Sequence, residues 1–199
     1  MRENFSPGLR IITIAGTASN TGKTTLVCEL LRALTPHEPW EAIKLTRGHY
    51  RSCGKDPHTC CVSSLLGAEP VVRSGRAETY VTGKDTARYW EAGASNVHWV
   101  IATNEQVEAG VRQALARVQT GRVLIEGTSL LKFVQPELAL LVGELEQSKI
   151  KASARQALRA GWIDALYLTE PGASSTLPVF TPQSFDALVE RVRAAVQAG

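Results

Sequence analysis

The sequence lacks any apolar run of transmembrane length, and aromatic residues make up only 6% of the chain. A bilayer-spanning helix needs about 20 consecutive apolar residues, so we expect no membrane partner. The N-terminal stretch MRENFSPGLR also lacks the apolar core of a signal peptide, which favours a cytoplasmic protein. The net charge of +3 is too small to argue for nucleic-acid binding, and the sequence carries no nucleic-acid motif.

Disulfides are not expected either, because cytoplasmic cysteines stay reduced. Three of the four cysteines fall in HYRSCGKDPHTCC, residues 49–61, together with two histidines. Such thiolates and imidazoles suit Zn²⁺ or another thiophilic metal. The alternatives are thiols that only pack, or a disulfide or redox pair formed by neighbouring thiols. The candidate Zn²⁺ ligands are Cys53, His58, Cys60 and Cys61.

Short β-branched or apolar runs alternate along the chain with segments of helical periodicity. Strands are predicted at 10–15, 41–46, 96–102, 121–127, 137–143 and 164–170. Helices are predicted at 24–34, 84–94, 104–119, 153–161 and 181–197. This alternation predicts one doubly wound α/β domain over residues 1–199, with a mostly parallel sheet. Residues 47–83, rich in Gly, Cys, His, Arg and Pro, are expected to form an insertion with local structure at the lip of the site.

The first predicted strand runs into GTASNTGKTT, residues 16–25, and a helix follows. Backbone N–H groups of such a loop surround phosphate oxygens, and the helix N-terminus adds partial positive charge. Lys23 suits the β- and γ-phosphates, Thr24 suits Mg²⁺, and Thr25 suits an α-phosphate. The alternative is a glycine-containing turn before a helix. The predicted nucleotide-binding residues are Gly16, Thr17, Asn20, Thr21, Gly22, Lys23, Thr24 and Thr25.

The loop has one residue more than the usual spacing between its two glycines. This spacing resembles that of the dethiobiotin synthetase and cobyrinate amidating synthetase group, in the branch of ATP-using P-loop enzymes that includes MinD-like ATPases. In that group the strand that carries the acid on the Mg²⁺ side often ends V-E-G, and this chain has LIEG at residues 124–127. The resemblance implies that Glu126 acts on Mg²⁺ or on its bound water; the alternative is a surface glutamate at a strand end.

A second resemblance covers about residues 10–145. AIKLTRGH (42–49), GKDTARYWEAGASNVHWVIA (83–102) and RVLIEG (122–127) occur in the order typical of the molybdopterin-guanine dinucleotide biosynthesis adaptor, the MobB family. Members of that family bind guanine nucleotide, are dimeric and are thought to assist molybdenum cofactor maturation. The resemblance therefore implies an α/β P-loop fold, a homodimer and a role in cofactor biosynthesis.

The MobB resemblance also implies that Lys44 and Asp85 belong to the nucleotide site. Lys44, at the end of a predicted strand, is expected to contact a phosphate or an anionic substrate. Asp85, at the start of a predicted helix, is expected to hold Mg²⁺, or alternatively to cap the helix. The family pattern I-K-H-T-H-H reads IKLTRGH here, and the chain continues well past residue 145. Function is therefore expected to have diverged around a retained nucleotide site.

Adenine and guanine are both candidates for the base of the nucleotide. The loop spacing favours ATP slightly, the MobB resemblance favours GTP, and no N-K-x-D guanine motif follows a late strand. The cations Lys44, Arg47, Arg51 and Lys55 suit an anionic second substrate, or else form a solvated surface.

Two functional hypotheses follow. The first is Mg²⁺-dependent nucleoside triphosphate hydrolysis or phosphoryl transfer. The second is a nucleotide-switched adaptor or metal-cofactor chaperone that acts on a partner protein with little turnover. The predicted catalytic residues are Lys23, Lys44 and Glu126, and the predicted Mg²⁺ ligands are Thr24, Asp85 and Glu126.

Overall fold

The protein is built around one eight-stranded sheet. The computed structural model describes residues 8–48, 65–146, 150–169 and 175–197, and the strand order in these residues is β3-β4-β2-β5-β1-β6-β7-β8. All neighbouring strands are parallel except β3, which runs antiparallel to β4. The strands are β1 (Arg10–Gly16), β2 (Glu41–Arg47), β3 (Val71–Ser74), β4 (Asn96–Ala102), β5 (Arg122–Glu126), β6 (Leu138–Val142), β7 (Ala165–Tyr167) and β8 (Val179–Phe180).

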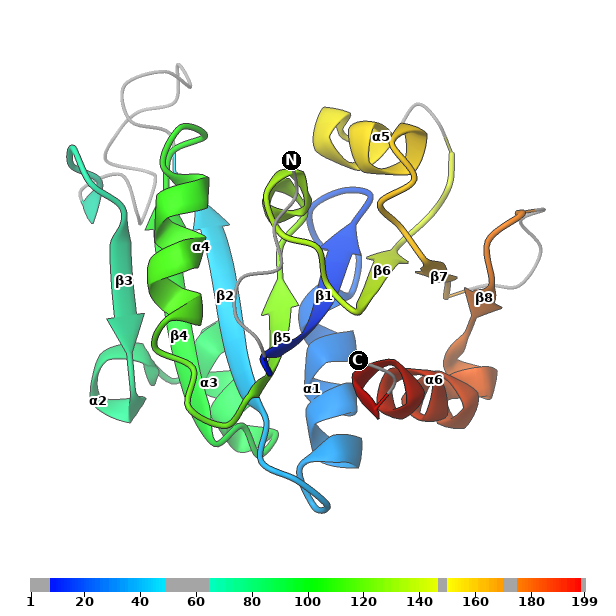
Figure 1. The fold of residues 1–199 in the computed structure, drawn as a ribbon, viewed down its shortest axis with the longest axis horizontal. Helices are drawn as coiled ribbons and strands as arrows, with labels where there is room; N and C mark the ends of the chain where they lie inside the picture. The colour runs from blue at the N-terminus through cyan, green and yellow to red at the C-terminus, as the bar shows by residue number, and fades with distance from the viewer. Residues whose placement is uncertain (1–7, 49–64, 147–149, 170–174, 198–199) are drawn as a thin grey trace.

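Helices cover both faces of this sheet (Figure 1). One face packs against α1, α3 and α6, and the other packs against α4, α5 and the short helix η2. The helices are α1 (Lys23–Leu34), α2 (Arg76–Thr79), α3 (Asp85–Glu91), α4 (Val107–Leu115), α5 (Ala152–Arg159) and α6 (Phe185–Gln197), with the 3₁₀ turns η2 (Ser129–Lys132) and η4 (Pro182–Ser184). In the part of the chain that the structure describes, no helix is both long and apolar enough to cross a bilayer.

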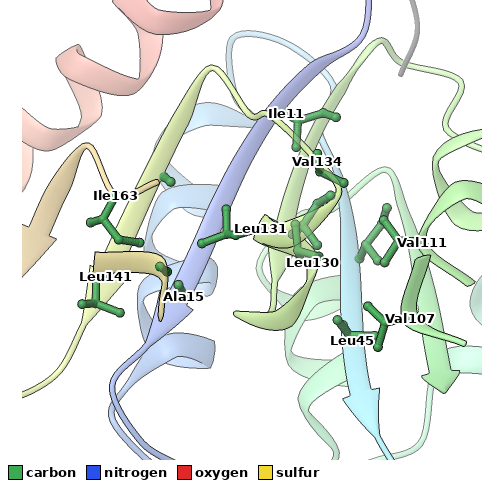
Figure 2. Close-up of a cluster of buried hydrophobic side chains, with 14 of the residues drawn as sticks. Ile11, Ala15, Leu45, Val107, Val111, Leu130, Leu131, Val134, Leu141 and Ile163 are labelled. Atoms are coloured by element: carbon green, nitrogen blue, oxygen red, sulfur yellow. The ribbon is translucent and has the colours of Figure 1, made fainter. Parts of the chain in front are cut away.

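The central strands β1, β5 and β6 are mainly apolar because both of their faces are buried. In β1, Ile12 and Ile14 contribute to the core under α1, α3 and α6. Ile11 and Ala15 point the other way, into the cluster beneath α4, α5 and η2 (Figure 2). Alternate residues of one strand thus supply two separate cores, and the predicted doubly wound α/β fold is confirmed.

Four of the described elements were not predicted, among them the short helix η2 between β5 and β6. β3 and α2 fall inside the expected insertion at residues 47–83, and β8 precedes the last helix. β3 has four residues and β8 has two, which is too short for any periodicity to show. β2 ends at Arg47, where that insertion was expected to begin, and residues 49–64 lie outside the described part of the chain.

A buried polar group ties together one side of the sheet. Glu41 at the start of β2 lies 2.7 Å from His98 Nε2 in β4, and both side chains are buried. The other Glu41 oxygen accepts hydrogen bonds from the backbone N–H groups of Gln119 (2.6 Å) and Thr120 (2.8 Å). His98 Nδ1 lies 2.9 Å from Ser74 Oγ in β3. One carboxylate thereby joins β2, β4 and the chain entering β5.

Removing the Glu41 carboxylate is expected to destabilise the fold. Glu41→Ala leaves the buried His98 and two partly buried backbone N–H groups without their acceptor, so we expect the free energy of unfolding to fall by about 3–5 kcal/mol. Urea denaturation at neutral pH measures the difference, with the near-isosteric Glu41→Gln as a second variant. A loss of less than about 1 kcal/mol in Glu41→Ala would contradict this assignment.

The contribution of Glu41 is also expected to depend on pH. Burial acts to raise its pKa, but the hydrogen bonds from His98 and from the two backbone N–H groups outweigh it, so the pKa lies below its ordinary value of 4.5. A lowered carboxylate pKa gives stability that is present above the unfolded-state pKa and disappears as the pH falls through the folded-state pKa. The free energies of unfolding of the wild type and of Glu41→Ala should therefore converge as the pH falls below 4.5, the ordinary pKa of a glutamate. Urea denaturation at a series of acidic pH values measures this.

Candidate functional site

The loop between β1 and α1 presents the open N-terminal end of a helix. Asn20 (φ 57°) and Gly22 (φ 87°) adopt the left-handed conformation that turns the chain into α1. Gly22 occupies the N-cap position of α1 and has no side chain that could cap the helix. The first turn of α1 contains no acidic residue. The N–H groups of that first turn have no partner within the helix, so the loop offers donors and partial positive charge to an anion.

Lys23 folds back across this loop. Its Nζ donates to the Ala18 carbonyl (2.8 Å) and to Thr21 Oγ1 (3.3 Å). A Cβ at position 16 would lie 2.6 Å from Lys23 Cδ and 2.7 Å from its Nζ. A side chain at position 16 would displace the lysine that crosses above it, so a glycine suits this position.

The far side of the loop rests on β6 and on the start of α5. The Thr17 N–H donates to the Val142 carbonyl (3.0 Å), and the Thr17 carbonyl accepts from the Lys151 N–H (2.8 Å). A Cβ at Gly143 would lie 2.4 Å from Thr17 Oγ1 and 2.8 Å from Thr21 Cβ. The loop therefore packs closely against the glycine that follows β6.

Glu126, at the end of β5, is the centre of a hydrogen-bond network. Its Oε2 accepts from Thr24 Oγ1 (2.7 Å) and from the hydroxyl of Tyr89, and its Oε1 accepts from Lys44 Nζ (2.6 Å). The same ammonium lies 2.7 Å from Asp85 Oδ2. Lys44 and Glu126 are partners in the register of β2 and β5, so their approach follows directly from the sheet.

This network groups four of the residues that the sequence motifs single out, namely Thr24, Lys44, Asp85 and Glu126. They come from α1, β2, α3 and β5, and they meet at the carboxyl ends of the central parallel strands, where ligands bind in open α/β sheets. Their catalytic and metal-binding roles stay predictions.

The protonation states around the network follow from burial and neighbouring charge. Burial lowers the pKa of Lys23. The nearby Glu126 carboxylate acts to raise this pKa, whereas the positive charge of Lys44 lowers it further. Burial acts to raise the pKa of Asp85, but the hydrogen bond and charge of Lys44 outweigh it and hold that pKa below its ordinary value. Burial and the Glu126 carboxylate place the Tyr89 pKa well above its ordinary value, so Tyr89 stays a neutral donor.

A cavity of about 580 Å³ opens over the loop and the network. Residues 19–25, the end of β2, the start of α3, the end of β5 and the start of α5 all line it. Five cations and two carboxylates are among these residues, which favours an anionic ligand. The charged lining residues are Lys23, Lys44, Arg47, Arg88, Lys151, Asp85 and Glu126.

Tyr89 and Lys151 are among the lining or supporting residues that the sequence reasoning missed, as is Arg88 on the cavity wall. Tyr89 lies one helical turn after Asp85 on α3, a spacing that places both on one side of the helix. Lys151 stands at the start of α5, in a connection that follows a buried strand. Its pKa is lowered to about 8, first by burial and then by the charges of Lys23 and Arg47, against the attraction of Glu126.

The predicted Zn²⁺ ligands Cys53, His58, Cys60 and Cys61 lie outside the described residues. Over the ranges that are described, no group of three or more His, Cys, Asp or Glu side chains is arranged to hold a metal ion. Cys28 is buried in the core between α1 and the sheet.

The parallel sheet, the glycine-rich loop before α1 and the lysine that crosses it define a P-loop NTPase fold. LpxK from Aquifex aeolicus, solved in complex with ATP, is similar in structure, with 17% identity and a TM-score of 0.53 over 91% of this chain and 56% of that chain. The chain thus spans about half of LpxK. This likeness and the topology together confirm the predicted fold class.

Two MobB structures are also similar to the chain. The MobB protein homolog from Bacillus stearothermophilus has 16% identity and a TM-score of 0.49, over 95% of this chain and 99% of that chain. Bacillus subtilis MobB has 15% identity and a TM-score of 0.48, over 94% and 98%. No protein-family model matches the sequence, and no curated protein matches it.

Tyr89→Phe is expected to weaken the network without opening a large cavity. The change removes a buried hydroxyl that donates to the Glu126 carboxylate, and a hydrogen bond to a charged group contributes about 1.5–3 kcal/mol. Urea denaturation should show a loss of stability in that range.

The matched control is Tyr80→Phe, because the Tyr80 hydroxyl donates to an exposed carboxylate, Glu91, at 3.0 Å. That substitution should change stability by less than about 0.5 kcal/mol. Equal effects of the two substitutions would show that the buried hydroxyl has no special role.

Proposed function

We propose that the protein binds a Mg²⁺–nucleoside triphosphate at this cavity and uses it for hydrolysis or phosphoryl transfer. The observation that supports this most is that residues 19–25 of the loop line a single cavity together with Lys44, Asp85 and Glu126 of the network. Phosphoryl transfer needs mainly positioning and stabilisation of charge. Loop amides, two partly buried lysines and a carboxylate network are the groups that such chemistry uses.

Lys23 is proposed to bind the β- and γ-phosphates. Its side chain is partly buried, and among the described residues its ammonium group hydrogen-bonds only neutral oxygens, those of Ala18 and Thr21. A phosphate oxygen offers a charge-assisted hydrogen bond instead, which is roughly twice as strong. Burial lowers the pKa of Lys23, and phosphate charge would raise it again, so binding keeps this lysine protonated.

Thr24, Asp85 and Glu126 are the residues proposed to hold Mg²⁺. Their hydroxyl and carboxylate oxygens are the hard donors that Mg²⁺ takes in proteins. Asp85 and Glu126 already share one cation, because the Lys44 ammonium lies 2.7 Å from the first and 2.6 Å from the second. The donor set therefore fits the ion. Bound Mg²⁺ neutralises charge on phosphate oxygens.

Lys44 and Glu126 are proposed to act on the reacting groups. Lys44 brings a buried positive charge to the edge of the sheet beside Thr24 (3.4 Å), where it can stabilise charge on the transferred phosphoryl group. Glu126 is held by three donors, so its position is set before a ligand enters. It is suited to orient an attacking water or the hydroxyl of an acceptor.

ATP is proposed as the first nucleotide to test. The loop spacing resembles that of ATP-using synthetases, and LpxK, which shares the fold, was solved in complex with ATP. GTP is the alternative that the MobB resemblance supports. That resemblance also supports a role in cofactor biosynthesis and a homodimer.

Lys23→Ala is expected to weaken binding of the preferred Mg²⁺–nucleotide by about 10- to 100-fold, because it removes a charge-assisted contact to phosphate. Titration calorimetry with ATP and GTP, each with Mg²⁺, measures this. Lys132→Ala is the matched control, since Lys132 is exposed and does not line the cavity. Unchanged affinity of Lys23→Ala for both nucleotides would refute the site.

Steady-state hydrolysis tests the chemical step. We expect turnover on the order of 1 s⁻¹ or faster once the acceptor is supplied. Glu126→Gln should lower turnover by about 10²-fold or more, while nucleotide affinity changes only a few-fold. Wild-type turnover that stays orders of magnitude slower and rises with a protein partner would favour the nucleotide-switched adaptor instead.

A further inference from the structure

The cavity has two chemically different sides. Side chains of a strand alternate between the faces of the sheet, and in β2 residue Lys44 lies on the side of Ala42, which belongs to the core under α1 and α3. Arg47 lies on the side of Leu45, in the core under α4 and α5. The carboxylates therefore gather with Lys44, while Arg47 stands on the α4/α5 side of the same opening.

Lys151 belongs to that α4/α5 side. It immediately precedes α5, and its backbone N–H is fixed to the Thr17 carbonyl at 2.8 Å. Within the described ranges, its ammonium group makes no ion pair and no hydrogen bond, although it is partly buried and lines the cavity. Arg47, also on the cavity wall, donates to a neutral group, Asn104 Oδ1, at 3.0 Å.

Cations held close together in a partly buried place repel one another. Lys23 on α1 and Arg47 on β2 are near enough to Lys151 to act on its ionisation, and Glu126 on β5 is the carboxylate that opposes them. The Glu126 carboxylate is itself already engaged by Lys44, Thr24 and Tyr89. An anion placed between Lys151 and Arg47 would relieve this repulsion.

The proposed nucleotide-binding groups do not include Lys151 or Arg47. The loop amides, Lys23 and the Mg²⁺ ligands would serve the triphosphate, and they lie at the N-terminus of α1 and on the Lys44 side. Lys151 and Arg47 line the α4/α5 side of the cavity, and Ser129 and Ser153 are also among its lining residues.

We propose that Lys151 and Arg47 form a second anion subsite, which binds the phosphate or carboxylate group of the acceptor molecule beside the terminal phosphate of the nucleotide. The assignment to an acceptor rests on the proposed function; the anion subsite itself does not. An acceptor held by its anionic group would be oriented toward the loop, and orientation of two reactants is a major source of rate acceleration.

The test uses the full chain, saturated with Mg²⁺ and a non-hydrolysable ATP or GTP analogue, with sulfate as the probe anion. Calorimetry at constant ionic strength should show sulfate binding to the wild type. Lys151→Gln and Arg47→Gln should each weaken it by about 10-fold, while affinity for the nucleotide analogue changes by less than about 3-fold. Lys132→Gln serves as the control for loss of one exposed charge. Competition by inorganic phosphate or by acetate then distinguishes a phosphorylated acceptor from a carboxylic acid.

A pH series gives a second readout. The Lys151 pKa of about 8 means that its charge disappears as the pH rises through this value, whereas sulfate keeps its charge. Sulfate affinity of the wild type should therefore fall between about pH 7 and pH 9. Lys151→Arg, which stays protonated, should bind sulfate with little change over the same range.

Each result bears on the inference. No sulfate binding to the nucleotide-loaded wild type, or binding that is unaffected by both substitutions, would overturn it. A 10-fold loss of nucleotide affinity in Lys151→Gln with unchanged sulfate binding would assign Lys151 to the nucleotide instead. If the wild type binds no nucleotide but binds sulfate through Lys151 and Arg47, the subsite is supported and the proposed function is contradicted.

Discussion

The Glu126 carboxylate is the group through which the parts of the site contact one another. Its two oxygens receive a hydroxyl from α1, a hydroxyl from α3 and an ammonium from β2. Each of these donors is attached to a different element, so the position of the start of α1, and with it the phosphate loop, depends on a buried charge at the end of β5. A single side chain thereby relates the loop that would hold phosphates to the groups that would act on them.

The parallel sheet explains why such a group exists at this place. β1, β2 and β5 are neighbours and run in the same direction, so their carboxyl ends meet at one edge. The apolar run that buries each strand stops there, and polar residues follow: the loop after Gly16, Lys44 and Arg47 in β2, and Glu126 in β5. The same pattern that builds the two cores therefore concentrates charge in one cavity.

Much of this arrangement could be predicted from the sequence. The alternation of strands and helices, the P-loop and the parallel sheet are local or periodic signals, and GTASNTGKTT, IKLT, GKDT and LIEG carry four residues of the network. Lys151 could not be chosen from the sequence, because its place at the cavity depends on the hydrogen bond from its backbone N–H to Thr17, which lies far from it along the chain. Tyr89 reads as one more apolar residue of a helix until its hydroxyl is seen to meet Glu126.

The short strands at the two ends of the described sheet bear on how copies of the chain can associate. β3 has four residues and β8 has two, so neither edge offers a long row of free backbone groups to a further strand. Edges this short protect a sheet from pairing with its own copies. The homodimer that the MobB resemblance implies would accordingly have to form through helices or connecting segments, and sheet extension is the mode of assembly that this architecture disfavours.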